Sequence, residues 1–163
     1  KQIETLNQIV KTAGGKLNYV KPHGALYNMA AKDAMIADAI SRAIKAIDAS
    51  LILYGLPNSA SETSAIQHEL RFYREVFSDR TYTDEGHLTP RSKTNAMIET
   101  VEQSIEQVLQ IILQETLQST TGSVISIKAD TVCIHGDGEN AVAFAQEINK
   151  ALHQNKITIS AIQ

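Results

Sequence analysis

The sequence contains little cysteine, no long apolar run and no cluster of basic residues, and each of these features excludes a class of protein. Cys133 is the single cysteine among 163 residues, so an internal disulfide is excluded and a reducing, cytoplasmic location is expected. No apolar stretch approaches the ~20 residues that span a bilayer. The net charge of −3, with basic residues spread along the chain, predicts neither a nucleic-acid partner nor a membrane partner.

Hydrophobic side chains are plentiful, at 43% of residues against 20% charged, which is the balance of a folded chain with a sizeable core. Strand-like apolar runs occupy residues 17–20, 51–54, 74–77, 131–134 and 157–160. Helical spacing of apolar residues separates most of these runs, at residues 36–47, 98–112 and 141–152. Asp33 is a predicted N-cap of the first of these helices, and Thr100 with Gln103 fits a capping box in the second.

Strands that alternate with helices predict an α/β fold with a mostly parallel sheet covered by helices, in a single domain over residues 1–163. A closed eight-stranded barrel typically takes ~250 residues, more than this chain offers. The chain is therefore either an open sheet or a barrel that lacks strands. The first residues show no signal-peptide pattern and open in a helix-like run, as expected of a chain that begins inside a fold.

Polar clusters follow two of the predicted strands. Lys21-Pro22-His23-Gly24 comes after residues 17–20, and His135-Gly136-Asp137-Gly138-Glu139 comes after residues 131–134. Ligands of parallel α/β folds bind at the carboxyl ends of the strands, because the loops there vary without disturbing the core. The positions of the two clusters predict one shared pocket.

In the first cluster, Lys21 offers a compact positive charge that can hold a carboxylate or stabilise a developing oxyanion. His23 can exchange a proton near neutral pH, and Pro22 and Gly24 would stiffen and sharpen the turn. The alternative is a solvated lysine beside a histidine that bonds a backbone carbonyl.

In the second cluster, Gly136 can take a positive φ between His135 and Asp137, and Gly138 would let the backbone approach an anionic ligand. The alternative is structural: Asp137 caps the final helix, and His135 ends a buried strand. The cluster matches neither a phosphate-binding loop with Gly-Lys-Ser/Thr nor a dinucleotide fingerprint, so no nucleotide motif is complete.

A long connection follows residues 74–77, and long loops in compact domains are often functional. Arg80 and Arg91 carry planar donor forks suited to carboxylate or phosphate, and Asp79 can orient either one. The alternative is a structural salt bridge between Asp79 and a nearby arginine. The other histidines lack metal-ligand spacing, so a structural zinc site is not expected.

Three segments carry a resemblance to a known family. They are Val20-Lys21-Pro22-His23-Gly24-Ala25-Leu26-Tyr27-Asn28, Glu75-Val76-Phe77-Ser78-Asp79-Arg80 with the residues up to Ser92, and Val132-Cys133-Ile134-His135-Gly136-Asp137. In order and spacing they resemble successive motifs of the LamB/YcsF family. The similarity extends over nearly the whole chain. Three motifs that begin family members are absent here, so the chain resembles the C-terminal two thirds of a member.

The resemblance implies a distorted β/α barrel, similar to that of the glycoside hydrolase/deacetylase group, without its N-terminal strands. It also implies the A subunit of a bacterial 5-oxoprolinase, which with subunits B and C opens 5-oxo-L-proline to L-glutamate. ATP, with Mg²⁺, is the expected cofactor. An apolar edge left by missing strands would favour a homo-oligomer.

Under this resemblance Lys21, Arg80 or Arg91 would bind the substrate carboxylate or a phosphorylated oxygen. His23 and His135 would move protons, with Asp137 orienting His135. Asp79 and Gly136 complete the expected binding residues. Two other functions stay open: a metal-dependent hydrolase or deacetylase of a sugar-like or lactam substrate within carbohydrate metabolism, and a non-catalytic scaffold for partner subunits.

Overall fold

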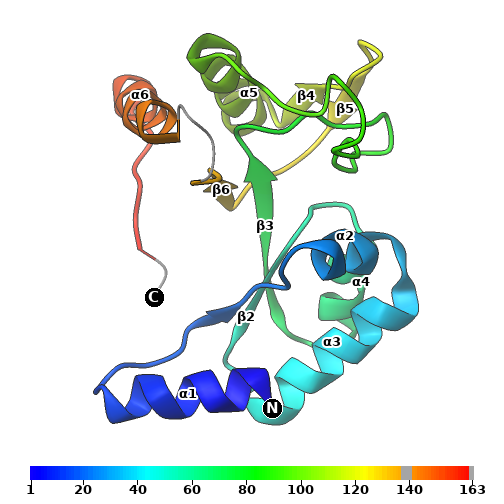
Figure 1. Cartoon of the computed structure of the whole chain (residues 1–163), viewed down its shortest axis with the longest axis vertical. Coiled ribbons are helices and arrows are strands. Elements are labelled where there is room, and N and C mark those ends of the chain that lie inside the picture. Colours follow the sequence, from blue (N-terminus) through cyan, green and yellow to red (C-terminus); the bar gives the residue numbers. More distant parts are fainter. Residues whose placement is uncertain (137–140, 162–163) are drawn as a thin grey trace. The chain divides into compact units, whose positions relative to one another are not determined.

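The computed structural model describes residues 1–136 and 141–161. Contacts divide the chain into two compact units, residues 1–74 and 75–161. Strand β3 (Arg71–Phe77) contributes its first residues to one unit and its last residues to the other (Figure 1). Among the described residues, no helix combines the length and the apolar character needed to cross a membrane.

The first unit is a small parallel sheet with helices. Besides the start of β3, its elements are α1 (Gln2–Thr12), β1 (Tyr19–Val20), α2 (Ala25–Lys32), α3 (Ala34–Ile47), β2 (Ile52–Gly55) and α4 (Ala60–Gln67). β2 pairs in parallel with β1 and with β3, and Tyr54 lies opposite Tyr73. Parallel strands joined by helices are the arrangement that the alternating apolar runs predict.

Local signals explain where the helices of the first unit begin. The Asp33 carboxylate accepts the backbone N–H groups of Met35 and Ile36, which confirms the predicted N-cap of α3. Ser59 caps α4 by accepting the N–H of Glu62. The helices then bury one face of the sheet in an apolar cluster of Ile44, Leu51, Leu53, Ala65 and Leu70.

The second unit begins with the end of β3, which pairs in parallel with β6 (Thr131–Cys133). Its other elements are α5 (Val101–Gln114), the antiparallel hairpin of β4 (Thr116–Gln118) and β5 (Val124–Ser126), and α6 (Ala141–Gln154). Its core includes a cluster of Val108 from α5 with Phe144, Ile148 and Leu152 from α6. Thr100 caps α5 by accepting the N–H of Gln103, which confirms the Thr100 half of the predicted capping box.

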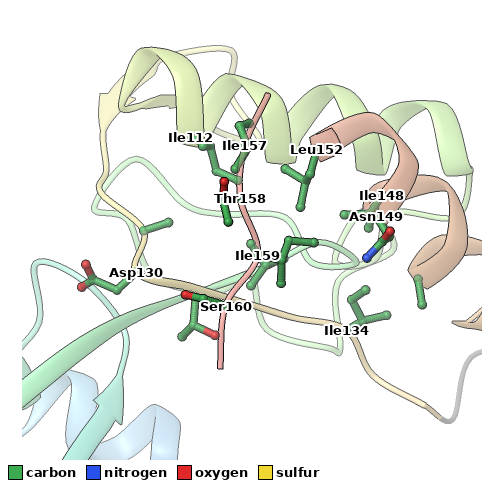
Figure 2. Close-up of a pocket in the computed structure, with 14 residues that line it drawn as sticks. Ile112, Asp130, Ile134, Ile148, Asn149, Leu152, Ile157, Thr158, Ile159 and Ser160 are labelled. Carbon is green, nitrogen blue, oxygen red and sulfur yellow. The ribbon is translucent and has the colours of Figure 1, made fainter. Parts of the chain in front are cut away.

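The prediction of a mostly parallel α/β fold is confirmed, whereas the strand predicted at residues 157–160 is wrong. That segment pairs with no strand in the described part of the chain. The N–H of Ile157 bonds to Leu152 at the end of α6, and its side chain packs into the α5–α6 cluster. The segment runs beside a pocket of about 390 Å³, also lined by Ile112, Ile134 and Ile148 (Figure 2). Apolar packing, rather than strand pairing, explains its hydrophobic pattern.

Candidate active site at the end of strand β3

The chain turns immediately after β3, and the residues of this turn are buried although they are polar. Ser78, Asp79 and Arg80 are between 0% and 7% exposed. Buried polar groups are costly unless they are hydrogen-bonded, so each of them needs an internal partner. The partner of Asp79 is the feature that matters most for chemistry.

Asp79 is paired with His135, which follows strand β6. The Asp79 Oδ2 atom lies 2.7 Å from the His135 ring Nδ1 and also accepts the His135 backbone N–H at 3.3 Å. The Phe77 ring stacks on the imidazole, with centroids 5.4 Å apart. The carboxylate is an acceptor, so the ring donates from Nδ1 and its Nε2 is left to accept a proton. The ring is therefore held in position from one edge and one face.

This pairing suits His135 to general acid–base work. A histidine whose Nδ1–H is held by a buried carboxylate keeps one tautomer, and the carboxylate stabilises the imidazolium that forms when Nε2 takes a proton. The second carboxylate oxygen of Asp79, Oδ1, is buried and accepts no hydrogen bond from the described residues. The site thus combines an oriented base with an acceptor whose hydrogen-bonding capacity is unused.

Arg80 lies in the same turn, but its guanidinium organises the loop. Its Nε donates to the Ala96 carbonyl at 3.2 Å, and its Nη2 donates to the Thr89 carbonyl at 2.5 Å. Burial, and next the positive charge of Arg91, hold the pKa of Arg80 below its usual value. Arg91 itself is exposed. Of the two predicted arginines, Arg91 has the more accessible side chain.

The other predicted cluster lies in the first unit, after β1. The Lys21 Nζ atom lies 5.6 Å from the centre of the buried Tyr27 ring, a cation–π contact. His23 is exposed, with no hydrogen bond to the residues that the structure describes. Gly24 has a φ of 60° and precedes α2, as expected of a glycine that sharpens a turn.

The predicted residues therefore fall into two groups. Asp79, Arg80, Arg91, His135 and Gly136 belong to the second unit, and Lys21 and His23 belong to the first. The predicted shared pocket stays a prediction. Asp137, expected to orient His135, lies outside the described residues. Within them, Asp79 lies at the His135 Nδ1 atom. Gly136 does not use a positive φ, and a Cβ there would meet open space.

Sequence reasoning linked Asp79 to an arginine and missed its pairing with His135. The available signal was the parallel pairing of the two strands. Phe77 of β3 lies opposite Cys133 of β6, and Asp79 and His135 each follow two residues after one of these partners. Two adjacent parallel strands bring the residues beyond their carboxyl ends to the same edge of the sheet.

Among residues 1–136 and 141–161, no group of three or more His, Cys, Asp or Glu side chains is placed to hold a metal ion. The sequence has no Gly-Lys-Ser/Thr phosphate-binding loop. The binding of Mg²⁺ and of ATP stays a prediction.

Parallel strands covered by helices, with a buried carboxylate and a histidine paired beyond their carboxyl ends, define an α/β protein equipped for acid–base chemistry. Comparison with known proteins gives its family. The model of the LamB/YcsF family matches residues 1–163, and the chain belongs to this family.

Two curated relatives and one solved structure are similar over almost the whole chain. The 5-oxoprolinase A subunits of Tolumonas auensis and Bacillus anthracis are each 47% identical over 161 residues, covering 99% and 98% of this chain. The crystal structure of the lactam utilization protein from Thermus thermophilus superposes with a TM-score of 0.89 at 36% identity, over 99% of this chain. In each case the chain spans 64% of the length of the protein that it matches.

Proposed function

We propose that this chain is part of the A subunit of an ATP-dependent 5-oxoprolinase, a cytoplasmic enzyme that opens the lactam of 5-oxo-L-proline to L-glutamate. The names of the curated relatives support this, and so does the lactam in the name of the structural neighbour. The observation within the chain that carries the proposal is the Asp79–His135 pair, since ring opening requires a proton to leave water and a proton to reach the ring nitrogen.

The reaction adds one water molecule across the amide bond. His135 Nε2 accepts a proton as the water oxygen bonds to the lactam carbonyl carbon, and Asp79 stabilises the resulting imidazolium through Nδ1–H. The carbon–nitrogen bond then breaks, and the imidazolium returns its proton to the departing nitrogen. The products are the new carboxyl group and the free amine of glutamate, so atoms and charges balance.

Substrate recognition is proposed to come from cations. The carboxylate of 5-oxoproline would bind a lysine or an arginine through a charge-assisted hydrogen bond. Lys21 and Arg91 are the better candidates, because two nitrogens of the Arg80 guanidinium already donate to backbone carbonyls. His23 remains a second candidate for proton transfer.

ATP and Mg²⁺ are proposed to act in the assembled enzyme with subunits B and C. An unactivated lactam resists hydrolysis because amide resonance weakens its carbonyl as an electrophile. Transfer of the terminal phosphoryl group of ATP to the carbonyl oxygen, with release of ADP, would remove that resistance. Ring opening would then leave a glutamyl phosphate, which a second water molecule would hydrolyse to glutamate and inorganic phosphate. The word "subunit" in the names of the relatives supports an assembly. The described residues are assigned the acid–base part of the work.

The test uses the complete gene product that contains this chain, incubated with 5-oxoproline, ATP and Mg²⁺, with and without subunits B and C. We expect glutamate to form when all three subunits and ATP are present. A matched reaction without ATP, and one in which the chain carries His135→Gln, should each lose that product. Absence of glutamate from an assembled three-subunit complex would contradict the proposal.

A further inference from the structure

Helix α5 contacts the turn that carries Asp79 through two polar side chains. The Gln107 amide nitrogen Nε2 donates to the Phe77 carbonyl at 2.8 Å and to the Arg80 carbonyl at 3.0 Å. Ser104, which is fully buried, donates from Oγ to the Ser78 carbonyl at 2.8 Å. One amide group therefore bonds to the main chain on both sides of the carboxylate-bearing residue.

The remaining main-chain groups of the turn are also fixed. The Asp79 carbonyl accepts the N–H of Ile98 at 3.0 Å. Ser78 donates to the Cys133 carbonyl from its N–H at 3.0 Å and from Oγ at 3.3 Å. All four carbonyls from residue 77 to residue 80 thus accept hydrogen bonds, and none of these bonds is part of a helix or of the pairing between β3 and β6. When every carbonyl of a buried, irregular segment is hydrogen-bonded, the backbone dihedral angles of that segment are fixed.

We propose that Gln107, assisted by Ser104, is a positioning residue that acts through Asp79 on His135. By holding the carbonyls of Phe77 and Arg80, the amide fixes the turn one peptide unit away from Asp79 on each side, and Ser104 fixes the Ser78 carbonyl in the peptide unit that directly precedes Asp79. Together these bonds set the direction of the Asp79 side chain. That direction keeps Oδ2 within 2.7 Å of Nδ1 and so selects the tautomer of His135. The effect on catalysis rests on the proposed function, whereas the effect on the tautomer does not.

The chemistry of the side chain explains why glutamine suits this position. An amide NH₂ group has two hydrogens and can serve two carbonyls at once, while a glutamate of the same shape has no donor. Gln107→Glu would place a carboxylate oxygen against two carbonyl oxygens. The two peptide units that carry the Phe77 and Arg80 carbonyls would turn away, the backbone between them would shift, and the Asp79 carboxylate would move relative to the imidazole.

The experiment compares Gln107→Glu with Gln103→Glu, a matched change one turn earlier on α5 at an exposed position. Long-range ¹H–¹⁵N correlation spectra at a pH of about 8.5, where an ordinary imidazole is neutral, report which ring nitrogen of His135 carries hydrogen. We expect the Nδ1–H form to predominate in the unaltered chain and with Gln103→Glu, and to lose that predominance with Gln107→Glu. An unchanged His135 tautomer in folded Gln107→Glu protein would overturn the proposal.

Two further measurements keep the result interpretable. If Gln107→Glu does not fold, Ser104→Ala removes one bond to the same turn, and a smaller shift in the same direction is expected. In the complete three-subunit enzyme, Gln107→Glu should lower glutamate formation about 10- to 100-fold, in line with the loss of one or two hydrogen bonds. A shifted tautomer in a protein whose unaltered form makes no glutamate would reject the proposed function and leave the positioning role established.

Discussion

The turn after β3 and the turn after β1 follow parallel strands and carry predicted site residues, yet they are built differently. In the turn after β3, main-chain carbonyls accept bonds from the side chains of Ser104 and Gln107, and Asp79 is buried against His135. In the turn after β1, His23 and Gly24 are exposed. A strand end alone therefore does not organise a site. Side-chain donors from α5 bond to the carbonyls of one turn, while in the other a glycine takes a positive φ and a lysine contacts a tyrosine ring.

The largest effect should come from His135, the histidine paired with Asp79 of the turn after β3. His135→Gln in the complete enzyme removes the proposed base, and turnover should fall at least about 100-fold. His153→Gln, at the exposed end of α6 in the same unit, is the matched control and should leave turnover unchanged. Steady-state glutamate formation measures both. Equal rates for the two variants would contradict the assignment of His135 as the base.

Lys21 gives the corresponding test in the other turn. If its ammonium group binds the substrate carboxylate, Lys21→Ala should lower kcat/KM about 10- to 100-fold through loss of a charge-assisted hydrogen bond. Lys32→Ala, an exposed change in the last turn of α2, should have no such effect. Kinetics at varied 5-oxoproline concentration check this. Matching values for both variants would contradict a role for Lys21 in binding the substrate carboxylate.

A substitution at Arg80 tests whether its guanidinium stabilises the folded loop, rather than whether it takes part in the reaction. Arg80→Ala leaves the buried carbonyls of Thr89 and Ala96 without their guanidinium donors, and the free energy of unfolding should fall by about 2–3 kcal/mol. Arg91→Ala, on the exposed side of the same loop, should change it by no more than about 0.5 kcal/mol. Urea unfolding distinguishes them. Similar losses would show that the loop does not depend on the buried guanidinium.

Glycine conformation distinguishes the turn after β1 from the segment after β6, by a smaller amount. Gly24→Ala forces a residue with a Cβ to keep a φ of 60°, which should cost about 1–2 kcal/mol of unfolding free energy although no neighbour crowds the new atom. Gly136→Ala faces open space without a positive φ and should be nearly neutral. The same urea titrations apply, and a reversed order would contradict the assignment of strain to Gly24.

The smallest effect is the pH dependence of the free energy of unfolding that comes from the Asp84 carboxylate in the second unit. Hydrogen bonds from Ser119 and then Thr121 hold the pKa of Asp84 below its usual value. A lowered folded-state pKa means that Asp84 stabilises the fold above the pKa of the unfolded chain, and that this contribution is lost as pH falls through the lowered value. Asp84→Asn should therefore be less stable than the unaltered chain at pH about 7, with the difference shrinking toward pH about 3. A constant difference would exclude a contribution from ionisation.

The sequence predicted elements that depend on local signals and missed those that depend on long-range partners. Asp33 and Thr100 act as caps because their donors lie two or three residues away, within reach of a pattern. The strand expected at residues 157–160 depended on a partner that the pattern could not supply. Likewise, Asp79 and His135 are 56 residues apart, and only the pairing of β3 with β6 brings them together.

A double-mutant cycle on Asp79 and His135 in the complete enzyme tests the central claim most directly. Turnover is measured for Asp79→Asn, for His135→Gln and for the two changes combined. If Asp79 acts through His135, each single change should cost at least about 100-fold, and the combined change should cost no more than the larger single loss. Losses that multiply in the double variant would show that the two residues act independently, which would contradict the account.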